Sequence, residues 1–235
     1  MIIIGDIHGN INGLIDKIKH HDMHNKNLIQ LGDAGIGFSH VSDYMDRWSD
    51  FNDFLEKRNI IMYIVRGNHD NPRYFGGKDD YTNIRFVPDY SVLNIENKNI
   101  LFLGGALSID RSVRLTGKSY WKNEGFVFDP TKVENLKNID LVVSHSCPNF
   151  AQPVNFNSIV DYWHDFEKGM DKNKNLKEEL KKERLLMASI YTILKSNKNP
   201  ITHWFYSHFH TSGRQIYEEI DFVLLDIDEW YDFKS

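Results

Sequence analysis

Short apolar runs alternate with helical patterns along the first part of the chain. The runs Met1–Ile4, Leu28–Leu31 and Ile60–Val65 are each followed by polar residues. Continuous apolar runs of this length are typical of strands that are buried on both faces. The intervening segments Ile11–His20 and Val41–Arg58 have helical patterns. The order strand, helix, strand, helix, strand predicts a mostly parallel sheet in an α/β fold.

The rest of the chain predicts further strands and one helical segment. Within residues 155–197 the composition shifts toward Lys, Asn and Glu, and apolar residues from Leu176 to Leu194 recur near the 3.6-residue period of a helix. We interpret residues 155–197 as a helical insertion. Strand-like stretches lie at Ile84–Val87, Ser91–Ile95, Ile100–Leu103, Ile139–Val143, Thr202–Tyr206 and Phe222–Asp226.

The composition is that of an ordinary soluble globular protein. The chain has 235 residues and no linker rich in Pro, Gly or Ser, which predicts a single domain over residues 1–235. Its net charge of -5 argues against duplex nucleic acid as a partner. Because Cys147 is the only cysteine, and neither a signal peptide nor a long apolar run is present, we expect a cytoplasmic protein with no membrane contact.

Five short blocks carry the candidate chemistry. They are Gly5-Asp6-Ile7-His8-Gly9-Asn10, Gly32-Asp33, Gly67-Asn68-His69-Asp70, Ser144-His145-Ser146 and Ser207-His208-Phe209-His210. Seven of these residues are candidate metal ligands: Asp6, His8, Asp33, Asn68, His145, His208 and His210. A structural zinc site takes four ligands and prefers cysteine, whereas seven suit two ions that share a carboxylate and keep positions for water and substrate. We expect two divalent ions, manganese first and iron, zinc or nickel as alternatives.

Each block alone is weak evidence. Asp6-x-His8 arises readily by chance, and Gly32-Asp33 is ordinary turn chemistry. The third block is more specific, because asparagine is an unusual metal ligand and the adjacent pair His69-Asp70 suits an oriented general acid.

In this order the blocks resemble the calcineurin-like metallophosphoesterase superfamily, from Asp6 to His210. The resemblance implies two packed mixed β-sheets flanked by helices, with the site in loops at one edge. It also implies that His69 is the proton donor, oriented by Asp70. By the same resemblance, one metal would be held by Asp6, His8, Asp33 and His210, and Asp33 would bridge to a second metal held by Asn68, His145 and His208.

This chemistry predicts a phosphoester hydrolase. Two cations neutralise the anionic ester and lower the pKa of a shared water, so that hydroxide attacks phosphorus while His69 protonates the leaving group. Arg66 resembles the phosphate-gripping arginine of phosphoprotein phosphatases and diadenosine polyphosphate hydrolases, which favours a phosphomonoester. Arg111 and Arg114 are further candidates for substrate contacts, in a loop that Trp121 and Glu124 would brace.

Other functions stay open. The segment after Asp33 lacks the Asp-Arg-Gly of phosphoprotein phosphatases, which weakens that assignment, and Ser207 replaces the glycine usual in the family. The substrate is expected to be a phosphorylated small molecule or a phosphoprotein. The alternatives are a dinucleotide or cyclic-nucleotide hydrolase, a nuclease, or a non-catalytic interaction module with the same fold. Tyr162 and Trp163 would either cover the site or simply pack.

Overall fold

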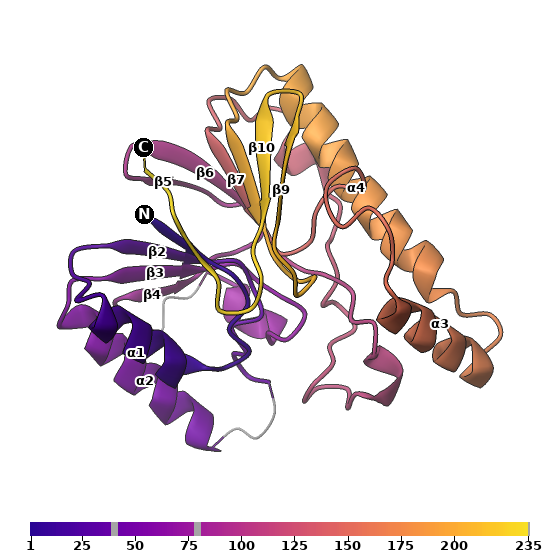
Figure 1. Cartoon of the computed structure of the whole chain (residues 1–235), viewed down its shortest axis with the longest axis horizontal. Coiled ribbons are helices and arrows are strands. Elements are labelled where there is room, and N and C mark those ends of the chain that lie inside the picture. The colour runs from indigo at the N-terminus through magenta and orange to yellow at the C-terminus, as the bar shows by residue number, and fades with distance from the viewer. Residues whose placement is uncertain (39–41, 78–80, 235) are drawn as a thin grey trace.

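The computed structural model describes residues 1–38, 42–77 and 81–234, and in these residues the strands form two mixed sheets packed face to face (Figure 1). The first sheet has the order β11-β1-β2-β3-β4, in which β1 to β4 run parallel and β11 runs antiparallel to β1. Its strands are β1 (Ile2–Ile4), β2 (Asn27–Gln30), β3 (Ile61–Ile64), β4 (Ile84–Phe86) and β11 (Trp230–Asp232).

The second sheet has the order β5-β6-β7-β8-β10-β9. Neighbouring strands from β6 to β10 run parallel, and the edge strands β5 and β9 run antiparallel to their partners. The sequence did not predict β9, a largely exposed edge strand, or the short β11. The strands are β5 (Val92–Ile95), β6 (Lys98–Leu103), β7 (Leu141–Ser144), β8 (His203–Tyr206), β9 (Gly213–Tyr217) and β10 (Ile220–Leu224).

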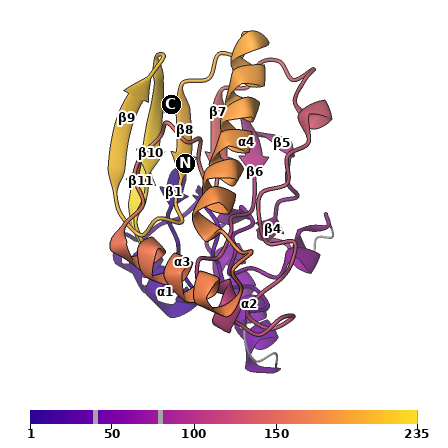
Figure 2. The ribbon, with the colours of Figure 1, turned by 90° about the vertical axis from the view of Figure 1, so that its right-hand side faces the viewer.

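Helices cover the outer faces of both sheets, which gives the expected architecture of two mixed sheets flanked by helices (Figures 1 and 2). The helices α1 (Ile11–His20) and α2 (Ser42–Glu56) pack on the first sheet. Val41, the expected start of α2, lies outside the described residues. Short 3-10 helices lie at Pro72–Phe75 (η1), Arg111–Val113 (η2) and Pro130–Lys132 (η3).

The segment 155–197 is helical, as predicted. It contains α3 (Ser158–Met170) and α4 (Leu176–Ser196). Met187 and Leu194 of α4 are fully buried in one cluster with Trp204 and Phe222 of the second sheet. Because these contacts form an apolar core, α4 is the outer layer of the sandwich, whereas α3 extends beyond the sheets (Figure 1).

Burial on both faces explains the continuous apolar runs. In β1, Ile2 and Ile4 face the α1 and α2 side, whereas Ile3 faces the second sheet, where it joins Phe102 and Phe205. The parallel strands of each sheet end at a common edge, which is where binding sites form in open α/β sheets. Among the described helices, none is both long and apolar enough to cross a bilayer.

Candidate metal centre

The predicted ligands all follow strands that end at the shared edge of the two sheets. The first sheet contributes three loops and the second contributes two, so the site depends on how the sheets pack. Asp6 and His8 follow β1, Asp33 follows β2, Asn68 follows β3, His145 follows β7, and His208 and His210 follow β8.

The structure brings these side chains together in groups with metal-ligand spacing. Asp6, His8 and His210 form one group, in which the ligand atoms lie within 4.8 Å of one another. Asp33, His145 and His208 form a second group, and Asn68 Oδ1 lies 3.0 Å from His145 Nε2. Asp33 also groups with His8 and His69, so its carboxylate lies between the two sets. The assignment of each side chain to one of two ions stays a prediction.

Unpaired polar atoms fit a pair of divalent ions. Asp6 Oδ2 is buried and has no hydrogen-bond partner among the described residues. His8 Nε2 and His210 Nε2 approach to 3.0 Å, and both rings point into the space beside Asp6. Buried carboxylate oxygens are rarely left unpaired, and converging imidazole and carboxylate groups suit borderline divalent ions.

The loops that carry the ligands have uncommon backbone conformations. His8, Asp33, His208 and His210 have φ values of 44°, 57°, 75° and 48°. Residues other than glycine seldom adopt this left-handed region, and when they do, they cluster at functional sites. The surrounding loops therefore hold these side chains in place at some cost in local strain.

A hydrogen bond to the backbone orients His145. Its Nδ1 lies 2.8 Å from the carbonyl oxygen of Leu31, which can only accept, so Nδ1 donates and Nε2 faces Asp33 Oδ1 at 3.2 Å. The Ser207 hydroxyl donates to the same carbonyl at 3.0 Å. Gly32 permits this approach, because a Cβ there would lie 2.5 Å from His145 Nδ1. Ser207 thus shares a hydrogen-bond acceptor with His145 and does not displace the imidazole.

The charges at the centre favour a bound cation. Burial raises the pKa of Asp33, but nearby His145 and His69 outweigh burial and hold that pKa well below its usual value. Burial lowers the pKa of His145, yet the carboxylates of Asp33 and Asp6 raise it on balance to about 9. Burial and the charge of His145 hold the pKa of His208 well below its usual value. The two carboxylates therefore attract positive charge to this position.

Asp70 does not have the orienting contact that we expected. Its carboxylate accepts hydrogen bonds from the backbone N–H groups of Gly35 (2.7 Å), Ile36 (3.1 Å) and Gly67 (2.8 Å), and none joins it to His69 within the described residues. Asp70 is fully buried, so its oxygens serve to join the loops after β2 and β3. The expected role of Asp70 is corrected to a structural one.

His69 is instead positioned by Arg114 and Phe38. Arg114 donates to His69 Nε2 at 2.7 Å, and the Phe38 ring stacks on the imidazole with 4.6 Å between centroids. Asp33 Oδ2 lies 3.8 Å from the same Nε2. Sequence reasoning missed Phe38, because no spacing pattern links it to the third block.

The phosphate-binding role expected of Arg66 is also corrected. Its guanidinium is buried, pairs with Asp89 at 2.7 Å and donates to the carbonyl oxygens of residues 104 and 123–125. This set of partners occupies the whole fork, so Arg66 fastens the end of β3 to the loop around Glu124 and has no donors for phosphate.

Arg111 and Arg114 lie on the same loop but have different partners. Arg111 pairs with Glu167 of α3 at 2.8 Å and with Glu179 of α4 at 2.7 Å, which corrects its expected substrate contact. Arg114 faces the centre, where it contacts His69 and donates to Ser108 Oγ at 3.0 Å. Ser108 also accepts from Asn68 Nδ2, again at 3.0 Å, a link that the sequence did not indicate.

A cavity of ≈ 670 Å³ opens over this centre. The candidate ligands Asp33, Asn68, His208 and His210 line it, together with His69 and Arg114. The Glu124 carboxylate accepts from the backbone N–H of Ser108 at 2.7 Å, and in this way it braces the loop that carries Arg114. The remaining lining includes apolar residues of α3 that carry no sequence motif.

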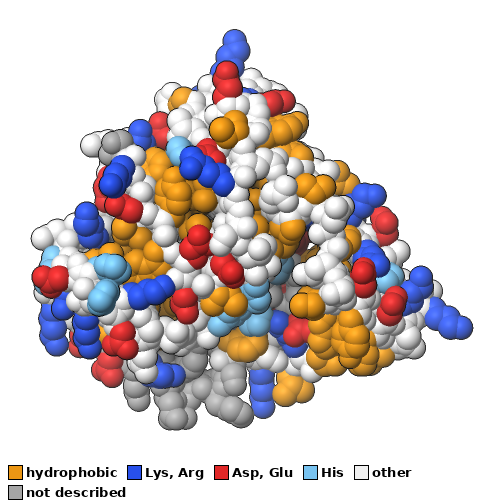
Figure 3. Space-filling view, viewed as in Figure 1, with side chains coloured by type: hydrophobic (Ala, Val, Ile, Leu, Met, Phe, Trp, Pro, Cys, Tyr) orange, Lys and Arg blue, Asp and Glu red, His pale blue; other side chains and the backbone are white. Residues whose placement is uncertain are grey.

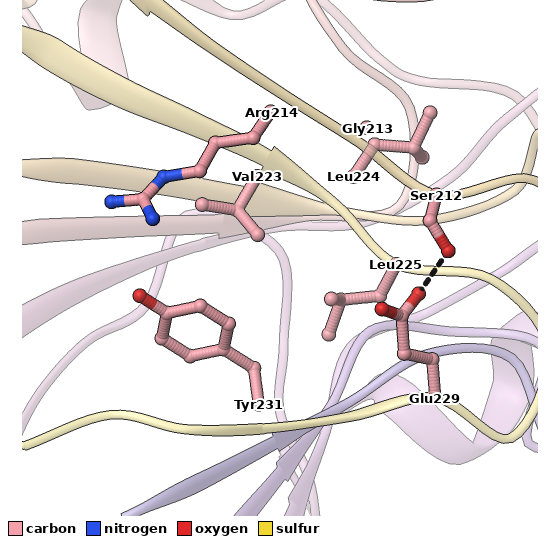
Figure 4. A pocket seen from close by; sticks show the side chains of 8 residues that line it. All are labelled: Ser212, Gly213, Arg214, Val223, Leu224, Leu225, Glu229 and Tyr231. Carbon is pink, nitrogen blue, oxygen red and sulfur yellow. Dashed lines mark hydrogen bonds between the residues drawn. The ribbon is translucent and has the colours of Figure 1, made fainter.

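Figure 4 shows a second hollow, beside β9 and β10. Ser212 donates to Glu229 across it, and Arg214 is paired with Asp221. None of the groups of metal-ligating side chains found in the described residues lies there. The lining residues are Ser212, Gly213, Arg214, Val223, Leu224, Leu225, Glu229 and Tyr231. The candidate chemistry is therefore concentrated at the strand-end cavity.

The comparison with protein families decides the assignment. The model of the calcineurin-like phosphoesterase family matches residues 1–212. The chain belongs to this family. Family membership and the grouped histidine and aspartate side chains make this chain a metal-dependent phosphoesterase. Among curated proteins, no match is found.

Three solved structures are distantly similar to this chain. The phosphopantetheinyl hydrolase of Mycobacterium tuberculosis is 14% identical, with a TM-score of 0.48 and coverage of 97% of this chain and 89% of that one. GAP50, the anchor in the inner membrane complex of Plasmodium, is 11% identical (TM-score 0.43; coverage 96% and 71%). A dimetal phosphatase from Danio rerio is 12% identical (TM-score 0.41; coverage 97% and 87%). The assignment rests on the family model and not on these structures.

Proposed function

We propose that this phosphoesterase holds two divalent ions and hydrolyses small phosphomonoesters. The observation that carries the proposal is the position of Asp33, whose carboxylate belongs to two groups of potential ligands at once. A shared carboxylate is what a pair of neighbouring ions requires.

The seven predicted ligands would be divided between the two ions. Asp6, His8 and His210 would hold one, and His145, His208 and Asn68 would hold the other, with Asp33 shared between them. When bound, such ions supply charge neutralisation and an activated water. We expect manganese in this role, with iron, zinc or nickel as alternatives.

Arg114 takes the role first expected of Arg66. Among the described residues, Arg114 pairs with Asp110 through Nε, donates to Ser108 through one terminal nitrogen and contacts His69 through the other. One N–H group on each terminal nitrogen is therefore left for a ligand. Its planar fork suits the several oxygens of a terminal phosphate, which supports a monoester over a diester. When Arg114 turns from His69 to phosphate, His69 Nε2 becomes free to carry the proton for the leaving group.

The cavity supports a small-molecule substrate. Its volume of ≈ 670 Å³ falls within the range of about 300–1,000 Å³ for sites that enclose a small ligand. We propose a phosphorylated small molecule ahead of a phosphoprotein, and we propose that the protein acts in the cytoplasm.

Hydrolysis of two model esters tests the proposal. The purified protein, loaded separately with manganese, iron, zinc or nickel, is assayed with p-nitrophenyl phosphate and bis-p-nitrophenyl phosphate. We expect faster turnover of the monoester, and loss of that turnover in Asp33→Asn. A preference for the diester would assign a phosphodiesterase or nuclease instead. No turnover of either ester with any metal would assign a non-catalytic interaction module.

A further inference from the structure

One part of the cavity wall is apolar. Phe156, Ile159, Val160 and Trp163 line the cavity from the segment before α3 and from its first turns, and Leu180 of α4 joins them. Val160 and Trp163 lie three positions apart in α3, which places them on the same side of that helix. We name these five residues the apolar wall. The same cavity therefore joins an ion-binding end to a hydrophobic one.

The apolar wall contains surface that a ligand can cover. Phe156 is 37% exposed and Ile159 is 56% exposed, although both line the cavity. Figure 3 shows hydrophobic side chains gathered toward the side of this face on which α3 lies. Covering such surface is favourable roughly in proportion to its area. A phosphate group bound at the ligands would leave most of the wall in water.

The position of the apolar wall is fixed by ion pairs. Glu167 of α3 is only 1% exposed and accepts two hydrogen bonds from Arg111, at 2.8 and 2.9 Å. Trp163 packs edge-on against Phe166, with 5.6 Å between ring centroids. The Trp163–Phe166 contact lies within α3, whereas the Arg111–Glu167 pair holds α3 beside the cavity in the absence of ligand. A wall of this kind is a preformed subsite, which reduces the cost of ordering it on binding.

We propose that the apolar wall binds the alcohol portion of the substrate, so that the preferred phosphoesters carry an alkyl or aryl leaving group. This inference rests on the proposed function, because the phosphate must sit at the ligand cluster for its ester oxygen to point along the cavity. The occupant follows from continuity with the centre: His69 and Arg114 line the same space as Phe156 and Val160. A sugar or a polar amino acid would place hydroxyl or charged groups against the five apolar side chains of this wall, which offer them no hydrogen bond.

Alkylphosphonates test the subsite without any turnover. Methyl-, butyl- and hexylphosphonate present the same anionic group and differ only in apolar length. Their affinities for the manganese-loaded protein are measured by isothermal titration calorimetry. Full burial of one methylene strengthens binding by up to about fourfold. We expect hexylphosphonate to bind about tenfold or more tightly than methylphosphonate.

Substitutions in α3 and in the segment just before it separate the effect of the apolar wall from general effects on binding. Phe156→Ala and Ile159→Asn should bring hexylphosphonate to within about threefold of methylphosphonate, while the affinity for methylphosphonate stays unchanged. Both side chains are partly exposed, so these variants should fold. The matched control is Met170→Asn, because Met170 lies on the same helix as Ile159, is 66% exposed and does not line the cavity. This control should retain the full dependence on chain length.

Equal affinities along the series, no binding of any phosphonate, or a gain that survives both wall variants would overturn the subsite. Hydrolysis of p-nitrophenyl phosphate, measured on the same samples, reports separately on the proposed function. Turnover without dependence on chain length rejects the subsite alone. Dependence on chain length without turnover rejects the phosphomonoesterase and keeps the subsite.

Discussion

Two arginines near the centre differ in what their guanidinium groups contact. Arg66 is buried and donates to Asp89 and to several backbone carbonyl oxygens, whereas Arg114 lines the cavity and contacts His69. A charge that is buried with all its partners is costly to remove, because the partners are left unsatisfied. A charge that faces a cavity is available to a ligand.

Substitution of each arginine should therefore affect a different property. Arg66→Ala should lower the free energy of unfolding by about 3–5 kcal/mol, because it leaves Asp89 and carbonyl groups without a partner. Arg114→Ala should reduce kcat/KM for a phosphomonoester by roughly ten- to a hundredfold, the loss of one charged hydrogen bond. Urea unfolding and steady-state kinetics on both variants check this pair. A stable, folded Arg66→Ala with impaired KM would restore the phosphate-binding role of Arg66.

The proton-donor role of His69 gives a second prediction for a single residue. We expect His69→Asn to reduce kcat by about 10² to 10⁴, the usual contribution of a positioned general acid. Bound metal, measured by elemental analysis, should stay near the level of the unsubstituted protein. The geometry makes the test necessary, because His69 lies within ligand distance of His8 and Asp33. If metal content fell together with turnover, His69 would be a ligand and not the acid.

At the level of elements, α3 is joined to the sandwich chiefly by side-chain contacts. Arg111 in η2 contacts both Glu167 of α3 and Glu179 of α4, so one guanidinium fixes two helices. The Arg111–Glu167 pair is largely shielded from water. By contrast, Lys177 and Asp161 form an ion pair between the same helices, with both partners more than one-third exposed.

Arg111→Gln should therefore loosen α3. We expect faster amide hydrogen exchange across Ser158–Met170, since the substitution leaves Glu167 buried without its main cation. Lys177→Gln is the matched control and should leave exchange nearly unchanged, because exposed pairs contribute about 0–1 kcal/mol. Hydrogen exchange followed by mass spectrometry measures both. Equal protection in both variants would mean that apolar packing alone holds α3.

At the level of the whole molecule, the candidate ligands come from the strand ends of both sheets. Ions bound there, as we propose, would connect the first sheet, through Asp6 and Asp33, to the second, through His145 and His208. A ligand that binds only the folded state stabilises it by an amount set by its concentration and Kd. Metal binding should thus be coupled to global stability.

Addition of manganese should raise the melting temperature, and excess EDTA should reverse the rise. At a hundred times Kd, the expected stabilisation is about 2.7 kcal/mol. Scanning calorimetry at increasing manganese concentration provides the measurement, with Asp33→Asn as the control that loses most of the shift. A melting temperature independent of manganese, in protein shown to bind it, would place the ions outside the folded strand-end site.

The sequence by itself determined the features that depend on residues close together in the chain. Apolar runs buried on both faces identified most of the strands. The short blocks predicted a set of candidate ligands that lie together in the structure, because each motif lies directly after its own strand. Tertiary structure decided which polar partner each side chain finds. Asp70 beside His69 binds loop backbone instead, and Arg111 contacts Glu167 and Glu179, which lie 56 and 68 positions away. The apolar wall, which comes from α3, the segment before it and α4, likewise has no motif. Such contacts depend on how segments far apart in the sequence pack together, and a local sequence pattern does not indicate that packing.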